Sequence, residues 1–308
     1  MFEVDVIIPV YKPEKEFLLL LELLERQSLP VNNIILINTE KKYFDQLITG
    51  TDFFEKHKKV LVKHITKEEF DHGGTRNYGV SLSKTDYFIM MTDDALPADE
   101  ELIRQLLEPF ADEKVGMSYA RQLPSKDCDV IESYTRSFNY PDRSLIKSSK
   151  DLKNMGIKAF FASNVCAAYK REIFDLLGGF TNYTIFNEDM IYARGLINAG
   201  YKIAYAANAG VIHSHNYSGV QQFKRNFDLG VSHADHPEIF SELSTESEGV
   251  RLIKKSCGYL CSIGKPHLTV KLIWLSGWKF MGYFLGKRYR RLPKGMVKAF
   301  TMNKNYWN

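Results

Sequence analysis

Apolar runs and amphipathic stretches alternate along the first third of the chain. Residues 4–10 form a β-branched run typical of a strand, and the leucine-rich residues 14–27 have the spacing and length of a helix. The alternation continues, with strands expected at 33–38, 60–65 and 86–91 and helices at 74–83 and 99–110. This order predicts an α/β fold with a Rossmann-like, mostly parallel sheet and helices on both faces.

The pattern is less regular after residue 119. Residues 120–156 are polar and are expected to form an irregular surface excursion, after which the apolar residues 159–169 return to the core. A further amphipathic helix begins at Glu188 and ends at Gly200. We expect one domain over residues 1–232, divided into halves near residue 119, and a helical extension over 233–308.

Ligands of such sheets bind beyond the carboxyl ends of the strands. The residues that follow the first four predicted strands should therefore border one crevice. These are Tyr11, Thr39, Asp71 and Asp94.

Two pairs of acidic residues lie at the ends of predicted elements, where they could bind a metal ion or act as a general base. Asp93 and Asp94 follow an apolar strand, which suits a divalent cation bound to phosphates, although aspartates also favour turns and helix caps. Glu188 and Asp189 open a helix, where acids favour the helix dipole but where a general base for a hydroxyl nucleophile would also fit.

Two further segments carry polar groups of interest. Paired glycines in HGGTRN allow close approach of a ligand, and Arg76 after them suits a diphosphate or a carboxylate. His213 and His215 alternate at strand spacing and so point the same way, as metal ligands, as diphosphate contacts or simply as hydrogen-bonded side chains.

Charge is distributed unevenly. The chain has 41 Lys and Arg against 37 Asp and Glu, yet residues 265–308 hold ten of the basic residues, no acidic ones and all three tryptophans. This composition favours a helix over residues 268–286 that attaches peripherally to an anionic membrane surface. The alternative is a helix that packs its aromatic side chains on the protein. Nucleic-acid binding is disfavoured, because the rest of the chain is acidic.

Cellular location can also be inferred from the sequence. The four cysteines are scattered without a CxxC pair, and the N-terminus reads as a strand instead of a signal peptide. We therefore expect a reducing, cytoplasmic setting, with the protein at the inner face of the plasma membrane.

Six segments in order resemble the inverting family-2 glycosyltransferases of the GT-A fold, and most closely their bacterial rhamnosyltransferase branch. The segments are VIIPVYKP, FDHGGTRNYG, MMTDDALP, FFASNVCAAYKREIFDLLGGF, FNEDMIYARGLINAGYKIAY and HSHNYSGVQQFKRNFDLG, which span about three-quarters of the chain. The resemblance implies a catalytic domain with a nucleotide-sugar half and an acceptor half, and a metal-dependent enzyme that requires Mg²⁺ or Mn²⁺.

The resemblance also assigns roles to residues. It implies that Asp189, beside Glu188, is the catalytic base and that Asp94 holds the metal, with His213 or His215 assisting; Thr92 stands where an aspartate is common. Donor contacts are implied at Pro9, Val10, Tyr11, Asn38, Asp71, Arg76, Asp93 and Asp94, and acceptor contacts at Asn164, Gly179 and Phe180.

The expected reaction is transfer of rhamnose from dTDP-β-L-rhamnose, with inversion, to a hydroxyl of a lipid-linked glycan in bacterial cell-surface polysaccharide synthesis. One alternative is a family-2 transferase with another donor, such as a UDP-hexose. A second is a catalytically silent scaffold that binds a nucleotide sugar at the membrane.

Overall fold

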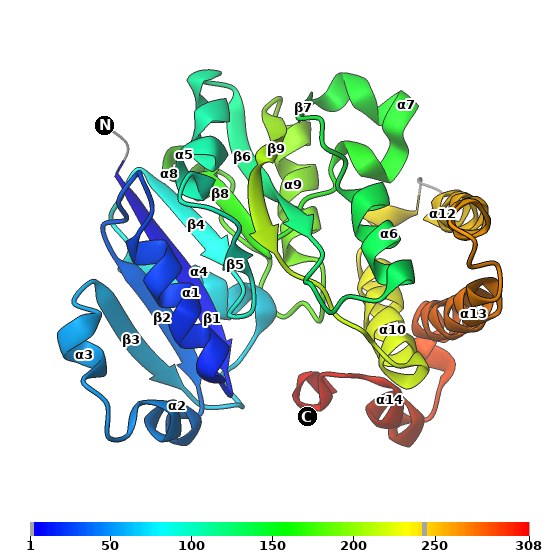
Figure 1. The fold of residues 1–308 in the computed structure, drawn as a ribbon, viewed down its shortest axis with the longest axis horizontal. Coiled ribbons are helices and arrows are strands. Elements are labelled where there is room, and N and C mark those ends of the chain that lie inside the picture. Colours follow the sequence, from blue (N-terminus) through cyan, green and yellow to red (C-terminus); the bar gives the residue numbers. More distant parts are fainter. Residues whose placement is uncertain (1–2, 242–244, 308) are drawn as a thin grey trace.

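A mixed β-sheet forms the centre of the computed structural model, which describes residues 3–241 and 245–307 (Figure 1). The strands lie in the order β3-β2-β1-β4-β8-β6-β9-β5, with β7 also paired to β9. Their bounds are β1 Val4–Tyr11, β2 Ile34–Thr39, β3 Val60–Ile65, β4 Tyr87–Met91, β5 Leu96–Pro97, β6 Val115–Leu123, β7 Leu145–Lys147, β8 Cys166–Lys170 and β9 Lys202–Ile212.

Most strands run in one direction. β3, β2, β1 and β4 pair in parallel, and β6 and β9 share their direction, whereas β8, β5 and β7 run the opposite way. The expected α/β fold with a mostly parallel sheet is therefore confirmed. The four N-terminal strands lie within about one residue of the ranges expected from the sequence.

Helices cover both faces of the sheet because alternate strand residues point to opposite sides. In β1, Val6 and Ile8 face the core formed with α1 (Lys15–Glu25) and α5 (Leu102–Leu107). Ile7 faces the core formed with α4 (His72–Leu82), α8 (Arg171–Leu176) and α9 (Glu188–Asn198). The short helices α2 (Lys41–Ile48) and α3 (Phe53–Lys56) add to the first core beside β2 and β3.

The stretch 120–156 is more ordered than expected. Its first residues complete β6, an inner strand of the sheet, and α6 (Val130–Asn139), β7 and α7 (Leu152–Met155) follow. The prediction of an irregular excursion was wrong here because Gln122 is polar yet buried, its amide satisfied by Tyr140 and Ser163. Single turns of 3₁₀ helix occur at Glu108–Ala111, Ser149–Asp151, Gly156–Ala159, Tyr289–Arg291 and Lys304–Trp307.

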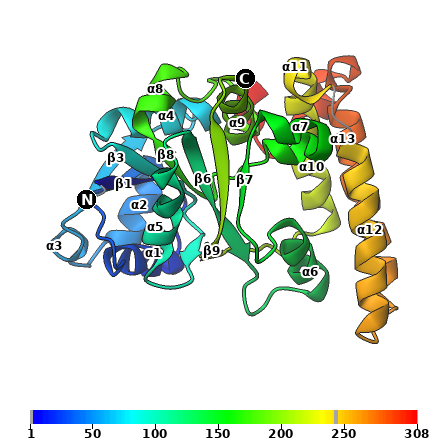
Figure 2. The same ribbon diagram turned by 90° about the horizontal axis from the view of Figure 1, so that it is seen from above.

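The C-terminal part is helical, with α10 (Gly219–Asp235), α11 (Pro237–Phe240), α12 (Thr245–Ser262), α13 (Leu268–Gly286) and α14 (Lys294–Phe300). Figures 1 and 2 show α12 and α13 at the end of the molecule opposite β3. α13 packs on α10 at Gly282 and Gly286, where an added Cβ would lie 2.2 and 2.1 Å from the carbonyl oxygens of Phe223 and Phe227. The expected domain boundary at residue 232 falls inside α10, which continues to Asp235.

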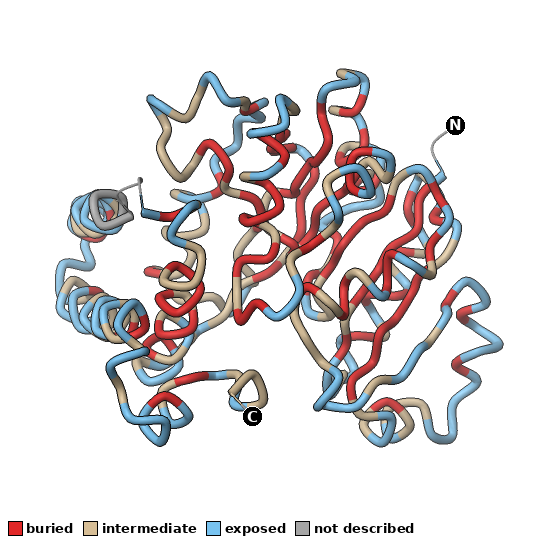
Figure 3. The backbone as a smooth tube through the Cα atoms, turned by 180° about the vertical axis from the view of Figure 1, so that it is seen from behind, coloured by how far each residue is buried: buried red, intermediate tan, exposed pale blue. Residues whose placement is uncertain are grey.

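α13 has two different faces. Leu272 is buried on the packed side, and Trp278 contacts Phe223 of α10. The opposite side carries exposed apolar residues at helical spacing, which we call the apolar stripe: Val270, Ile273, Trp274, Phe280, Met281 and Phe284. Figure 3 shows buried positions concentrated in the sheet and exposed ones along this helix. None of the described helices combines the length and the apolarity needed to cross a membrane.

Candidate active site

The first acidic pair lies at the carboxyl end of β4, beside the end of β1. The backbone N–H of Tyr11 donates to Asp93 Oδ2 at 3.1 Å, which joins the two strand ends. Tyr11 is in register with Thr39 of β2, as the crevice prediction requires. Burial, followed by repulsion from Asp94, raises the pKa of Asp93 to about 6.

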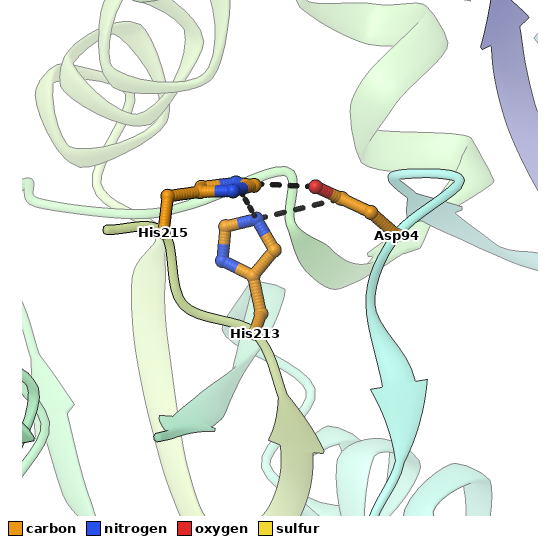
Figure 4. Close-up of side chains that lie close together, drawn as sticks. All are labelled: Asp94, His213 and His215. Atoms are coloured by element: carbon orange, nitrogen blue, oxygen red, sulfur yellow. Dashed lines mark hydrogen bonds and ion pairs between the residues drawn. The ribbon is translucent and has the colours of Figure 1, made fainter. Parts of the chain in front are cut away.

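Asp94 faces the two histidines that follow β9 (Figure 4). Its carboxylate oxygens lie 3.4 Å from His213 Nε2 and 3.1 Å from His215 Nε2, and the two imidazole nitrogens are 3.1 Å apart. Burial opposes ionisation of Asp94, but the neighbouring imidazoles of His213 and His215 together outweigh it and lower the pKa of Asp94. The fold thus brings Asp94 next to His213 and His215, which lie about 120 residues further along the sequence.

Gln122 of β6 orients His213. The guanidinium of Arg136, which can only donate, contacts Gln122 Oε1, and the amide nitrogen donates to Tyr140 Oη at 2.7 Å. Gln122 Oε1 also lies 3.2 Å from His213 Nδ1, so Nδ1 carries the proton and Nε2 keeps its lone pair. Sequence reasoning missed Gln122 and Arg136, because both lie in the stretch expected to be irregular.

The three groups fit a divalent cation. One ligand atom from each of Asp94, His213 and His215 lies within 4.8 Å of the others, so a single ion could contact all three. The unprotonated His213 Nε2 and the ionised carboxylate are both in the form that binds metal.

The second acidic pair begins α9. Asn187 before it adopts a left-handed backbone with φ of 67°. Both oxygens of Asp189 accept backbone N–H groups, from Asn164 at 2.9 Å and from Met190 at 2.7 Å. The side chain of Asn164 donates to Glu188 Oε1 at 3.1 Å, so Asn164 holds both carboxylates.

Arg76 gives the two neighbouring carboxylates different ionisation. Its Nε lies 3.2 Å from Glu188 Oε1 in a buried ion pair. Burial would raise the pKa of Glu188, but Arg76, together with His72 and the hydrogen bond from Asn164, outweighs burial and lowers that pKa. Burial and the charge of Glu188 raise the pKa of Asp189 to about 7. Asp189, which is only partly buried, is therefore a carboxyl group that can exchange a proton near neutral pH.

The HGGTRN segment fastens α4 to the loop before α9. Asp71 Oδ2 accepts from Gly74 N at 2.6 Å and from Tyr183 N at 3.0 Å, and an added Cβ at Gly73 would lie 1.8 Å from Thr181 O. Asn77 makes two hydrogen bonds to the backbone of Phe180. These contacts give Asp71 a capping role in addition to any donor contact.

The expected acceptor residues lie in this region too. Gly179 has φ of +77°, and the side chain of Phe180 is 2% exposed and packs on Tyr169 and Phe174. The side chain of Phe180 thus faces the core. A contact between the acceptor and the backbone of Gly179 and Phe180 remains a prediction.

Asn38 lies at the end of β2, in register with Val10, while Pro9 is the preceding residue of β1. Asn38 Nδ2 donates to His64 Nδ1 at 3.0 Å. Its Oδ1 is buried and has no hydrogen-bond partner among the described residues. Burial, followed by the charge of Lys41, lowers the pKa of His64, which keeps its imidazole neutral and able to accept this bond.

The sequence also matches a known protein family. The model of glycosyl transferase family 2 matches residues 5–178, more than half of the chain. The chain belongs to this family.

Two curated relatives of this family-2 glycosyltransferase are rhamnosyltransferases by name. It is 36% identical over 309 residues to the O-antigen chain rhamnosyltransferase RfbN of Salmonella typhimurium, covering 99% of this chain and 96% of the relative. It is 42% identical over 246 residues to the O-antigen chain rhamnosyltransferase WbaN of Salmonella anatum, covering 79% and 78%. The chain is thus a glycosyltransferase enzyme.

Solved structures share the fold. A mannosyltransferase from Pyrobaculum calidifontis, in complex with GDP-Man and Mn²⁺, matches with a TM-score of 0.60 at 14% identity, over 94% of this chain and 86% of that one. Residues 1–349 of TarS from S. aureus, in complex with UDP-GlcNAc, match with a TM-score of 0.52 at 12% identity, over 94% and 91%.

Proposed function

We propose that the enzyme transfers rhamnose from dTDP-β-L-rhamnose, with inversion, to a hydroxyl of a lipid-linked glycan in bacterial cell-surface polysaccharide synthesis. The names of two relatives at 36% and 42% identity carry the proposal for the sugar. The separate acidic pairs support a single displacement, since one pair can serve the donor diphosphate and the other the acceptor.

Asp189 is the proposed base. The backbone N–H groups of Asn164 and Met190 fix its carboxylate, and its raised pKa suits it to accept a proton. As the acceptor oxygen forms a bond to the anomeric carbon, the bond from that carbon to the diphosphate oxygen breaks. The hydroxyl proton passes to Asp189 and dTDP leaves, so attack from the opposite face inverts the anomeric centre.

Asp94, His213 and His215 are the proposed ligands of a divalent cation, with Asp93 beside them. Such an ion, when bound, neutralises charge that develops on the diphosphate. The mixture of nitrogen and oxygen ligands suits Mn²⁺ better than Mg²⁺, for which oxygen ligands dominate. Arg76, held between the acidic pairs, contributes positive charge to the same crevice.

Asn38 is the proposed contact for the base of the donor. Because its amide nitrogen is engaged by His64, the carbonyl oxygen Oδ1 is the atom left to accept a hydrogen bond. The imide N–H of thymine or uracil is a donor, whereas the corresponding nitrogen of cytosine is an acceptor. Among the pyrimidines, an acceptor facing N3 favours thymine or uracil over cytosine, in agreement with a dTDP sugar.

The C-terminal tail is proposed to attach the enzyme to the cytoplasmic face of the membrane. The apolar stripe of α13, next to the basic residues after Gly286, is the combination that binds an anionic bilayer surface. Deleting the tail is a poor test of attachment, because α13 packs on α10 and its loss would expose that helix. Substitutions in the apolar stripe are the better choice.

A donor screen tests the proposal. Purified enzyme is incubated with an acceptor glycolipid, Mn²⁺ and each of dTDP-rhamnose, UDP-glucose and GDP-mannose, and the product is analysed by mass and by NMR of the new linkage. We expect transfer from dTDP-rhamnose alone, with an α-linked product. Transfer from a UDP-hexose, or from GDP-mannose, would replace the donor assignment.

A further inference from the structure

A groove of about 650 Å³ lies between α13 and the end of α10 with α11, away from the residues assigned to catalysis. Its walls are apolar and aromatic, with Phe240, Phe280 and Phe284 among the lining residues. His233 stacks on Phe240 at 4.0 Å between ring centroids, and its Nδ1 lies 3.0 Å from Tyr283 Oη. These contacts give the groove a packed, preformed wall.

The rim of the groove is strongly basic. Lys287, Arg288, Arg290 and Arg291 line it, and none of the other described residues along it is acidic. Arg290 is paired with Asp235 at 2.7 Å, but among the side chains that the structure describes no carboxylate lies at ion-pair distance from the other three. The guanidinium of Arg288 lies over the ring of Phe284, 3.7 Å from its centroid. The groove therefore offers uncompensated positive charge directly beside exposed aromatic surface.

The apolar stripe leads into this groove. Phe280 and Phe284 belong to both, and they are 63% and 41% exposed. A ligand complementary to this surface has an anionic group joined to an apolar chain, because neither a free anion nor an uncharged hydrocarbon would satisfy both parts.

We propose that the groove is a discrete binding site for an anionic membrane phospholipid. The phosphate headgroup lies among Lys287, Arg288 and Arg291, and the first part of the acyl chains lies against the aromatic walls. The proposal rests on the proposed membrane attachment and deepens it, since it replaces diffuse attraction to a charged surface with one lipid held at a defined site.

This site is connected to the catalytic carboxylates through α10. Ser232, the residue before His233, accepts a hydrogen bond from Asn187 Nδ2 at 3.1 Å, and Asn187 immediately precedes Glu188. A lipid held in the groove would therefore fix the start of α9 relative to the bilayer, where a lipid-linked acceptor is held.

Binding of monomeric lipid tests the site without a membrane. Full-length protein is titrated by calorimetry with dihexanoyl phosphatidylglycerol below its micellar concentration, and separately with dihexanoyl phosphatidylcholine and inorganic phosphate. We expect one saturable site for phosphatidylglycerol, with at least tenfold weaker binding of the other two. Absence of saturable phosphatidylglycerol binding would refute the proposal, and equal affinity for inorganic phosphate would reduce the groove to a free-anion site.

Matched variants locate the site. Arg288→Ala with Arg291→Ala should weaken phosphatidylglycerol binding at least tenfold. Lys265→Ala with Lys294→Ala removes the same charge from exposed positions outside the groove and should change it less than twofold. Ala234→Leu, which narrows the groove without changing charge, should also weaken binding. Equal losses in the two double variants would show diffuse electrostatics and overturn the assignment.

A parallel measurement separates this proposal from the proposed reaction. Transfer from dTDP-rhamnose to a water-soluble acceptor analogue does not require the groove, so the double variant at Arg288 and Arg291 should retain it. If the donor assay fails in the wild-type enzyme while lipid binding is saturable, the reaction assignment is wrong and the lipid site stands.

Discussion

Replacing Glu188 by Gln should move the acidic limb of the pH–rate profile to lower pH. Asp189 accepts a proton only when it is ionised, so kcat/KM should fall as the pH drops below its pKa of about 7. The negative charge of Glu188 is one of the two causes that hold this pKa above the usual 3.8. Gln is nearly isosteric and keeps an oxygen for Asn164, but it removes that charge.

The size of the shift follows from the environment of Asp189. About three pH units separate the ordinary carboxyl pKa from the value at this site, and burial accounts for more of that difference than Glu188 does. Loss of the Glu188 charge also leaves Arg76 without its ion-pair partner, and this acts in the same direction. We therefore expect the limb to move down by about one pH unit, equivalent to about 1.4 kcal/mol.

The assay is initial-rate transfer at low substrate from pH 5 to 9, with circular dichroism to confirm folding at each pH. Asp93→Asn is the matched control, since burial also raises the pKa of Asp93, to about 6, but Asp93 is joined to Tyr11 instead of Glu188. An acidic limb that stays in place in Glu188→Gln but moves in Asp93→Asn would refute the assignment of Asp189 as the base.

Four other changes test the remaining parts of the site. Asp189→Asn should lower kcat by about 10²–10⁴-fold while donor affinity, measured by calorimetry, stays unchanged; loss of donor affinity would place Asp189 at the donor. Asp94→Ala should abolish the enhancement of donor binding by Mn²⁺, and full wild-type activity in excess EDTA would exclude a metal role. Gln122→Leu should weaken Mn²⁺ affinity about 10–100-fold through loss of His213 orientation, a result that unchanged metal titrations would contradict. Gly73→Ala should cost about 1–3 kcal/mol of stability in denaturant unfolding, whereas Gly195→Ala, which has open space around it, should cost none.

The local sequence pattern was sufficient to predict the first strands and helices and the acidic residues at their ends. β1 to β4 were predictable because apolar, β-branched runs bounded by polar residues have few other stable conformations. The positions of Asp93 after β4 and of Glu188 at the start of α9 follow from the same boundaries. The resemblance of six segments to family 2 then gave the enzyme class, which the family match confirms.

Long-range packing decided what local patterns could not express. Gln122 looks like a loop residue in sequence, and only the fold shows that it orients His213 from a buried strand. The ion pair of Arg76 with Glu188, which separates the pKa values of two adjacent carboxylates, joins residues 112 positions apart.

The C-terminal tail shows the same contrast between what the sequence determines and what packing determines. Its basic and aromatic composition is a property of the sequence, but the same side chains could pack on the protein or face a membrane. The tertiary structure determines which face of α13 does which. Close contacts of Gly282 and Gly286 with α10 bury one side of the helix, and the apolar stripe on the other side remains exposed. Sequence therefore determined which chemistry the chain carries, whereas packing between distant segments determined which groups meet and which remain accessible.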